Sequence, residues 1–193
     1  MKKKVPHLAM IGVVLAFAFA QAESGKNLLK NPTFSAVGGS GAQSWEFSTF
    51  NFKDKPEVAE QLEWKRVKEE DGTYTLYFAT RSNMKSNLWW QQLLPTVGGE
   101  TYTFSVEARG LTKPNTKYAS VSVGVYFLDA NDRWLGYQDI SDAKVSAVET
   151  WTRIEGTVSA PEDAAKMGVR FGSLFDGGVE ISFKDPALTV GSN

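Results

Sequence analysis

The chain of 193 residues carries 21 lysine and arginine residues against 22 aspartate and glutamate residues, with one histidine and no cysteine. The histidine is His7, so the rest of the chain cannot form a Ser-His-Asp triad, a Cys-His pair or the usual zinc sites. Carboxylates, lysine, tyrosine and serine with lysine remain for chemistry. The balanced charge gives no basic surface of the kind that binds nucleic acid.

The first 22 residues have the pattern of a signal peptide. A basic start (Met1–Lys4) precedes an apolar run (Leu8–Ala20) and a small-x-small cleavage signal ending at Ala22. The apolar run is shorter than the roughly 20 residues of a membrane span. We expect residues 1–22 to be removed and residues 23–193 to form one exported domain, periplasmic or extracellular, with no membrane segment. Without cysteine, a lipoprotein anchor is excluded.

Short alternating segments separated by turn residues fill the rest of the chain. Asp71-Gly72 predicts a hairpin between two of them. Pro56–Gln61 permits one helical turn, and Arg81–Asn87 is interpreted as a linker. In order, the expected strands are Asn27–Ser35, Trp45–Phe52, Leu62–Lys68, Thr73–Thr80, the segment with Trp89 and Trp90, Thr101–Arg109, Ala119–Leu128, Arg133–Tyr137, Trp151–Ser159, Lys166–Ser173, Val179–Phe183 and Ala187–Val190. This spacing predicts an all-β sandwich in a single domain.

Alternation also predicts an open face opposite the core. Its expected members come from three strands: Glu107 and Arg109, then Gly124 and Tyr126, then Gly168, Arg170 and Gly172. Tyrosine, arginine and glutamate supply the flat and planar polar groups that sugars require, and the glycines would leave floor space for a ligand. The alternative is that Glu107, Arg109 and Arg170 only form cross-strand ion pairs.

The tryptophans leave choices open. Trp89 and Trp90 are adjacent on one strand, so their side chains face opposite ways. Trp134 and Tyr137 follow a turn and lie either on the rim of the face or in edge packing. Trp45 and Trp64 fit the core or the surface equally.

Several segments together resemble a known family. They are NLLKNPTFS (Asn27–Ser35), GGETYTFSVEAR (Gly98–Arg109), the Phe127–Asp129 turn, WTRIEGTVSAPEDAAKMGVRF (Trp151–Phe171) and ISFKDPALTV (Ile181–Val190). In this order they resemble the jelly-roll carbohydrate-binding modules of the family 4, 9, 16 and 22 type, which have the galactose-binding-like fold. The resemblance implies a non-catalytic domain that binds glycan chains in a groove on its concave sheet, with a glycoside hydrolase as a possible partner.

The resemblance also bears on individual residues. Family spacing to Tyr102 places Gln92, and with it Trp90, on the open side, and Trp151 matches a tryptophan that is usually in the core. The family often holds a structural calcium with acidic residues where this chain has Ser35 and Lys184. Calcium prefers several oxygen ligands including carboxylates, so we expect no metal and no cofactor.

Three function classes follow. The first is an exported, non-catalytic carbohydrate-binding module whose ligand-contacting residues are Trp90, Gln92, Glu107, Arg109, Tyr126, Trp134, Tyr137 and Arg170. Its partner would be a poly- or oligosaccharide. The second is an envelope or extracellular protein-interaction domain on the same fold. The third is a jelly-roll glycosidase or lyase, which the single clear carboxylate of the predicted face, Glu107, disfavours because glycoside hydrolysis normally uses two.

Overall fold

The computed structural model describes residues 25–39, 41–48 and 56–191. The predicted signal peptide and the end of the predicted strand Trp45–Phe52 lie outside this part. Its strands are β1 (Val37–Gly38), β2 (Gly41–Ala42), β3 (Glu46–Ser48), β4 (Leu62–Lys68), β5 (Tyr74–Thr80), β6 (Met84–Pro95), β7 (Thr101–Thr112), β8 (Tyr118–Leu128), β9 (Trp134–Lys144), β10 (Thr152–Ser159), β11 (Lys166–Gly177) and β12 (Val179–Val190). A four-residue helix, α1 (Pro56–Ala59), and a 3-10 turn at Val145–Ala147 complete it. Within the described ranges no helix is long and apolar enough to cross a bilayer.

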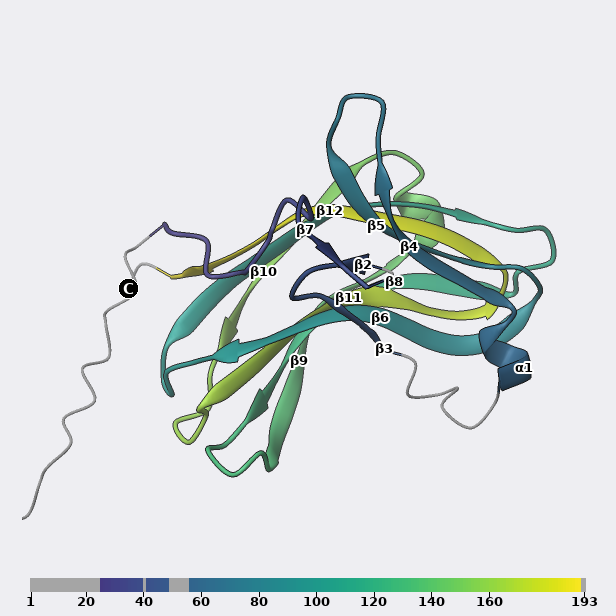
Figure 1. Ribbon diagram of the computed structural model, residues 1–193. Coiled ribbons are helices and arrows are strands. Elements are labelled where there is room, and N and C mark those ends of the chain that lie inside the picture. Colours follow the sequence, from purple (N-terminus) through teal and green to yellow (C-terminus); the bar gives the residue numbers. More distant parts are fainter. Residues whose placement is uncertain (1–24, 40, 49–55, 192–193) are drawn as a thin grey trace, which may run out of the picture.

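Two five-stranded antiparallel sheets face each other (Figure 1). Sheet 1 has the order β3-β6-β11-β8-β9, and sheet 2 has the order β10-β7-β12-β5-β4. Strands next to each other in space are often far apart in sequence, as β11 lies between β6 and β8. The all-β sandwich predicted from the sequence is confirmed.

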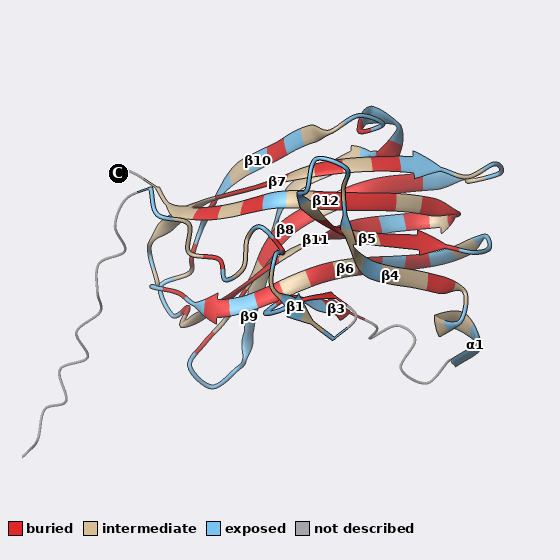
Figure 2. Ribbon diagram, turned by 45° about the horizontal axis from the view of Figure 1, so that its top comes forward, coloured by how far each residue is buried: buried red, intermediate tan, exposed pale blue. Residues whose placement is uncertain are grey.

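The core lies between the sheets and is built by the alternation of each long strand. Phe171 of sheet 1 meets Phe183 of sheet 2 with ring centroids 4.8 Å apart. The inward sets of β7, β8 and β11 are fully buried as predicted; they are Phe104, Val106, Ala108, Val121, Val123, Val125, Phe127, Met167, Val169 and Phe171. Figure 2 shows buried stretches of the strands interrupted by intermediate and exposed positions. Each large side chain contributes about 1.5–3 kcal/mol through burial.

The hairpin predicted at Asp71-Gly72 is confirmed, and Gly72 has a φ of 86°, which favours glycine there. The linker predicted at Arg81–Asn87 is wrong for its second half, because β6 begins at Met84 and pairs with β11 over its whole length. The last two predicted strands are one strand, β12, with a register shift between Lys184 and Ala187.

The predicted strand Asn27–Ser35 is also wrong, because this segment is a series of turns. Asn31 and Phe34 have φ values of 49° and 53°, in the left-handed region that the regular part of a strand does not use. The Asn31 side chain bonds to the backbone of Ala36 and Gln43, so it replaces sheet pairing with local bonds.

Candidate functional site

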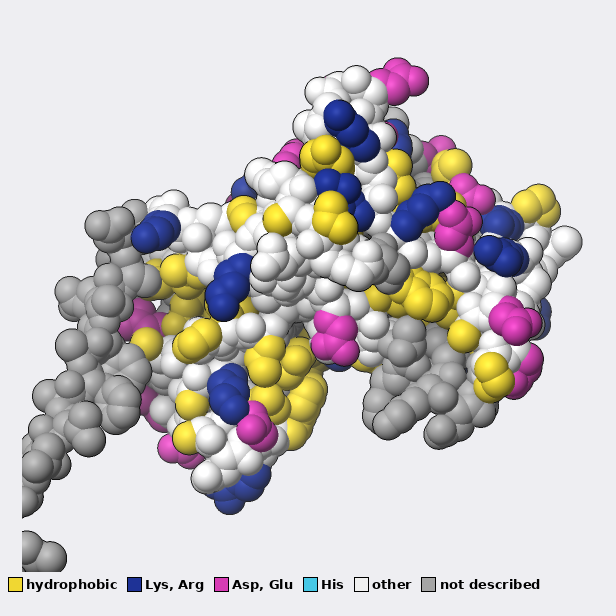
Figure 3. All heavy atoms as spheres, viewed as in Figure 1, with side chains coloured by type: hydrophobic (Ala, Val, Ile, Leu, Met, Phe, Trp, Pro, Cys, Tyr) yellow, Lys and Arg dark blue, Asp and Glu magenta, His cyan; other side chains and the backbone are white. Residues whose placement is uncertain are grey.

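The outer face of sheet 1 carries a group of aromatic side chains around one arginine. We call Trp89, Tyr126, Trp134, Tyr137 and Arg170 the aromatic platform. The strand registers bring them together: Arg170 of β11 pairs with Gln91 and Gly124, Gly172 pairs with Trp89, and Tyr126 pairs with Tyr137. Figure 3 shows hydrophobic side chains gathered beside the β8–β9 hairpin on this side of the molecule.

Arg170 lies at the centre of the platform. Its guanidinium carbon is 3.9 Å from the ring centroid of Tyr137, 5.1 Å from that of Trp89 and 5.9 Å from that of Tyr126. In the described part of the chain, no ion pair involves this guanidinium. Cation–π contacts orient it, while its N–H groups keep their capacity to donate to a ligand.

A stacked pair of rings forms the β8–β9 side of the platform. Tyr126 and Trp134 have centroids 5.5 Å apart and planes only 13° apart, and Trp134 is 58% exposed. A ring this exposed offers a flat apolar surface, which suits the C–H face of a sugar. Of the two placements left open by the sequence, the exposure of Trp134 agrees with the rim of an open face, whereas Tyr137 is half-buried on the same face.

The two tyrosine hydroxyls of the platform stay protonated at neutral pH. Burial is the largest influence on Tyr126 and raises its pKa, with Arg170 opposing and Glu46 adding to the shift. Burial also raises the pKa of Tyr137, against the opposing effect of Ser122 and Arg170. Both groups therefore remain neutral hydroxyls.

The glycines of the face have a different role from the one predicted. Gly168 and Gly124 do not leave floor space for a ligand, because a Cβ on Gly168 would overlap the Tyr126 ring and a Cβ on Gly124 would overlap the Tyr137 hydroxyl. The glycines instead let the two tyrosine side chains lie close against the sheet. The tyrosines, not bare backbone, are the surface presented to a ligand.

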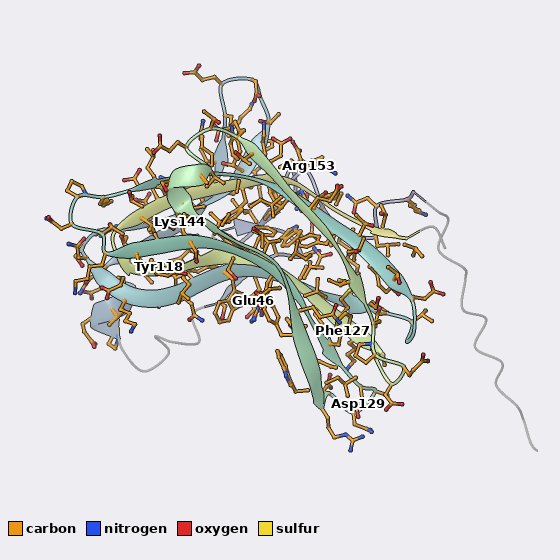
Figure 4. The ribbon with its side chains drawn as sticks, turned by 180° about the vertical axis from the view of Figure 1, so that it is seen from behind. Glu46, Tyr118, Phe127, Asp129, Lys144 and Arg153 are labelled. Carbon is orange, nitrogen blue, oxygen red and sulfur yellow. The ribbon has the colours of Figure 1, made fainter. Side chains whose placement is uncertain are left out.

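A chain of polar groups leads from the platform to the β3 edge. The Trp89 indole N–H donates to Gln91 Oε1 at 3.1 Å, and Gln91 Nε2 donates to Glu46 Oε2 at 3.2 Å. Figure 4 shows Glu46 on this side of the molecule, away from Asp129 at the β8–β9 turn. A cavity of about 100 Å³ lies beside these hydrogen-bonded groups. It is lined by Asn87, Leu88, Trp89, Ser122, Arg170, Gly172, Ser173 and Leu174. Sequence reasoning missed Glu46 and Gln91. The only available signal was that Gln91 lies two residues after Trp89 on one strand and therefore faces the same way.

The predicted outward placement of Trp90 and Gln92 is wrong. Trp90 is 1% exposed and packs against Phe47 with centroids 4.9 Å apart. Gln92 is buried because it accepts from the Lys30 amide at 2.7 Å and donates to the Lys30 and Ser44 carbonyls. Trp89 is the tryptophan of this pair that faces outward.

Glu107 and Arg109 are also misplaced by the prediction, since they lie on the outer face of sheet 2. There Glu107 contacts Lys184 at 3.5 Å and Arg109 contacts Glu69 at 3.7 Å. Trp151 is not in the core: it is half-buried on this face, with Arg109 4.7 Å and Lys184 4.6 Å from its ring centroid. Alternation along a strand separates the core-facing side chains from the outward-facing ones. It does not say on which of the two outer faces of the sandwich an outward-facing residue lies.

The structural calcium of the resembling family does not fit the residues present. Arg66 donates to the carbonyls of Phe34 and Ser35 at 2.7 and 2.9 Å, so a guanidinium already satisfies these oxygens. Lys184 brings an ammonium to the other expected position. Among the described residues no group of three His, Cys, Asp or Glu side chains is arranged to hold a metal.

Residues 26–173 match the family CBM_4_9, a carbohydrate binding domain, and the chain belongs to this family. No curated protein matches the chain. The fold is similar to that of several solved carbohydrate-binding modules, so the predicted jelly-roll β-sandwich and its family type are confirmed.

Three of these structures illustrate how similar the solved modules are to this chain. The C-terminal family 22 module of Clostridium thermocellum Xyn10B has a TM-score of 0.56 and 16% identity over 82% of this chain and 90% of that chain. TmCBM61, in complex with β-1,4-galactotriose, has a TM-score of 0.50 and 15% identity over 86% and 99%. The CBM22-1–GH10 part of Clostridium thermocellum Xyn10B, complexed with xylohexaose, has a TM-score of 0.54 and 17% identity over 78% of this chain, which spans only 26% of that structure.

Proposed function

We propose that the protein is an exported, non-catalytic module that binds a poly- or oligosaccharide on the outer face of sheet 1. The aromatic platform is the observation that carries the proposal. The exposed Trp134 ring, stacked on the half-buried Tyr126, provides a surface for a pyranose ring, and a guanidinium free of ion pairs in the described chain provides paired donors for neighbouring hydroxyls. Gln91, Glu46 and Ser122 add donors and acceptors around it.

The related structures support the ligand class. The CBM22-1–GH10 modules of Xyn10B were solved in complex with xylohexaose and TmCBM61 in complex with β-1,4-galactotriose, and both ligands are chains of neutral sugars. The CBM22-1 module is joined to a GH10 module in its own chain, which supports a glycoside hydrolase as the functional partner of this protein. Each sugar hydroxyl exchanges a water contact for a protein contact, so we expect weak binding with a dissociation constant of about 1 mM to 1 μM.

Affinity electrophoresis tests the proposal. Migration of the protein from residue 23 onward is measured in gels with soluble xylan, β-1,4-galactan or a soluble cellulose derivative. We expect at least one polymer to retard the protein. We expect Trp89→Ala, Tyr126→Ala and Arg170→Ala each to weaken binding to that polymer by about 1–3 kcal/mol.

Two matched controls use residues outside the platform. Tyr118 lies on β8 like Tyr126, but at the opposite end of the strand (Figure 4). Arg133 is 78% exposed and pairs with Asp129. Tyr118→Ala and Arg133→Ala should migrate as the unchanged protein does. A retarded protein whose three platform variants bind normally would move the site elsewhere.

A further inference from the structure

The opposite side of the molecule carries a second hollow, which we call the hairpin pocket. It encloses about 400 Å³ on the outer face of sheet 2, and its lining is Glu69, Glu70, Asp71, Thr73, Arg109, Trp151 and Lys184. The first four of these residues belong to the β4–β5 hairpin, which projects from the molecule at the top of Figure 1. This volume lies within the range of about 300–1,000 Å³ that small-molecule pockets have.

The pocket combines an indole ring with donors that are only loosely paired. Arg109 and Lys184 both lie within 5 Å of the Trp151 ring centroid, at 4.7 and 4.6 Å. Their ion pairs are long: Arg109 is 3.7 Å from Glu69, and Lys184 is 3.5 Å from Glu107. Hydrogen bonds need about 2.7–3.2 Å, so these cations retain N–H groups that a ligand in the pocket can engage.

The hairpin wall is fixed before any ligand arrives. Thr75 donates to Glu69 Oε1 at 3.1 Å, and Asp71 accepts from the Thr73 amide at 2.9 Å and from the Thr73 hydroxyl at 2.6 Å. These bonds position the acceptor carboxylates at the tip of the hairpin. Binding then costs little ordering of the wall.

A neighbouring hollow of about 300 Å³ continues from the hairpin pocket along β7 and β12, and the two share Arg109. It is lined by Tyr77, Arg109, Gly110, Leu111, Glu149, Glu180 and Ser182. The two together give an extended depression with an aromatic residue in each part, Trp151 and Tyr77. A ligand longer than one sugar unit therefore has somewhere to extend.

The charges select the class of ligand. Both cations of the hairpin pocket face carboxylates, so no excess of positive charge attracts an anion. The lining has three carboxylates, Glu69, Glu70 and Asp71, against these two cations, which offset most of their attraction for a cation. Directed donors and acceptors around an indole, without an excess of positive charge, suit a neutral molecule rich in hydroxyl groups.

We propose that the hairpin pocket is a second glycan-binding site, specific for a neutral mono- or oligosaccharide, on the sheet opposite the aromatic platform. The two sites share no residue, so this inference does not depend on the function proposed for sheet 1. A chain with both sites would bridge two glycan strands.

Nuclear magnetic resonance of the indole N–H groups separates the two sites. The protein is titrated with xylohexaose, β-1,4-galactotriose and methyl β-xyloside to about 10 mM, which reports dissociation constants up to that range. Single Trp→Phe variants assign the signals of Trp89, Trp134 and Trp151. We expect one sugar to shift the Trp151 signal along its own saturation curve, distinct from that of Trp89 and Trp134.

Variants decide the assignment. Arg109→Ala, at a side chain 42% exposed, should weaken the Trp151 response roughly tenfold and leave the Trp89 response unchanged. Arg153→Ala is the control, because Arg153 lies on the same sheet, pairs with Glu155 and is outside both hollows. Arg170→Ala should weaken only the platform response.

Failure of each site is visible separately. An unmoved Trp151 signal with every sugar, or equal effects of Arg109→Ala and Arg153→Ala, would overturn the second site. A silent Trp89 and Trp134 pair together with free migration in all polysaccharide gels would overturn the function proposed for sheet 1 alone.

Discussion

Gly168 shows how a single residue without a side chain shapes the candidate site. Its absent Cβ leaves the volume that the Tyr126 ring occupies, and Tyr126 in turn stacks on Trp134. The position of the ring pair therefore depends on a glycine on the neighbouring strand. The same holds for Gly124 beneath the Tyr137 hydroxyl.

Replacing Gly168 by alanine tests this dependence. The added methyl group forces the Tyr126 ring outward, so we expect glycan binding to weaken about tenfold, or about 1.4 kcal/mol. Stability should fall by only about 1 kcal/mol, the low end for overpacking, since the ring can move into solvent. Gly156→Ala on β10 is the control, because its Cβ would meet Ile140 at 2.9 Å and no residue of the platform. Equal binding by both variants would refute the role of Gly168.

Tyrosine ionisation predicts how stability responds to alkaline pH. Burial, followed by the charges of Glu180 and Glu63, raises the pKa of Tyr77 to about 12, while an unfolded chain titrates near 10. A pKa raised in the folded state gives stability that is complete below about pH 10 and is lost as the pH rises through the folded pKa. Urea unfolding at pH 9 and pH 11 should show this decline, and Tyr77→Phe should reduce it. A decline of the same size in Tyr77→Phe would assign it to other groups, of which Tyr126 and Tyr137 are candidates.

Residue-level prediction succeeded where alternation was decisive and failed where one polar residue has an unusual environment. Leu88, Trp90 and Leu94 share one parity on β6, and this apolar majority marks the inward side. Gln92 has the same parity, and its polarity favours the opposite assignment. It is buried only because it bonds to the backbone of Lys30 and Ser44, 62 and 48 residues away. A sequence does not display such distant partners.

The N-terminal segment is the element that most needs side-chain support. Its described residues 25–36 contain no strand, and Phe34 holds a φ of 53° that is unfavourable for a large residue. Phe34 is nevertheless fully buried and packs edge-on against Trp45 with centroids 5.5 Å apart. The Arg66 guanidinium of β4 donates to the carbonyls of Phe34 and Ser35, and its central carbon lies 3.8 Å from the ring centroid of Tyr74.

Arg66→Ala should destabilise the protein measurably. Two hydrogen bonds from a charged donor are lost and two carbonyls lose their partner, a cost of about 1.5–3 kcal/mol. For a chain of this size, each kcal/mol lowers the melting temperature by about 2–4 °C. Lys68→Ala, at an exposed residue of the same strand, is the control. Melting curves of both variants measure the contribution of the Arg66 hydrogen bonds to stability. Identical melting temperatures for the two variants would mean that packing alone fixes the N-terminal segment.

Calcium should not change the stability of the unaltered protein. Arg66 and Lys184 supply positive charge where the resembling family often binds the ion, and a metal that bound only the folded state would raise the melting temperature. We expect the same melting curve with a chelator and with excess calcium. A rise of several degrees with calcium would reveal a site built from other oxygens.

Strand existence was largely predictable, while sheet membership was not. Period-two patterns identified β4, β5, β7, β8, β10 and β11. Which strands share a sheet depends on pairings such as β12 with both β5 and β7, which join segments far apart in sequence. This is why Glu107 and Arg109 were grouped with Tyr126 and Arg170, although two different sheets carry them.

At the scale of the whole molecule, export is a prediction from the first 22 residues. The described residues begin after this stretch, and their first contact between distant segments is made by the Asn27 side chain, which donates to the Pro186 carbonyl and accepts from the Leu188 amide, each at 3.1 Å. Expression with a secretory pathway should yield a protein that begins at Glu23. Mass spectrometry of the exported product measures this, and a product that retains Met1 to Ala22 would refute cleavage.

The whole molecule should also lack hydrolytic activity. Only carboxylates, lysine and hydroxyl groups are available after His7, and the platform's polar groups are oriented by one another: Gln91 donates to Glu46 and accepts from Trp89. Glycoside hydrolysis normally needs two carboxyl groups that flank the bond, one with a raised pKa to act as the acid. Incubation with xylan, β-1,4-galactan and a soluble cellulose derivative should release no reducing ends above a heat-denatured control. Release that survives repurification and disappears in Glu46→Gln would identify an enzyme, because that substitution keeps the shape of the side chain and removes only its ability to exchange a proton.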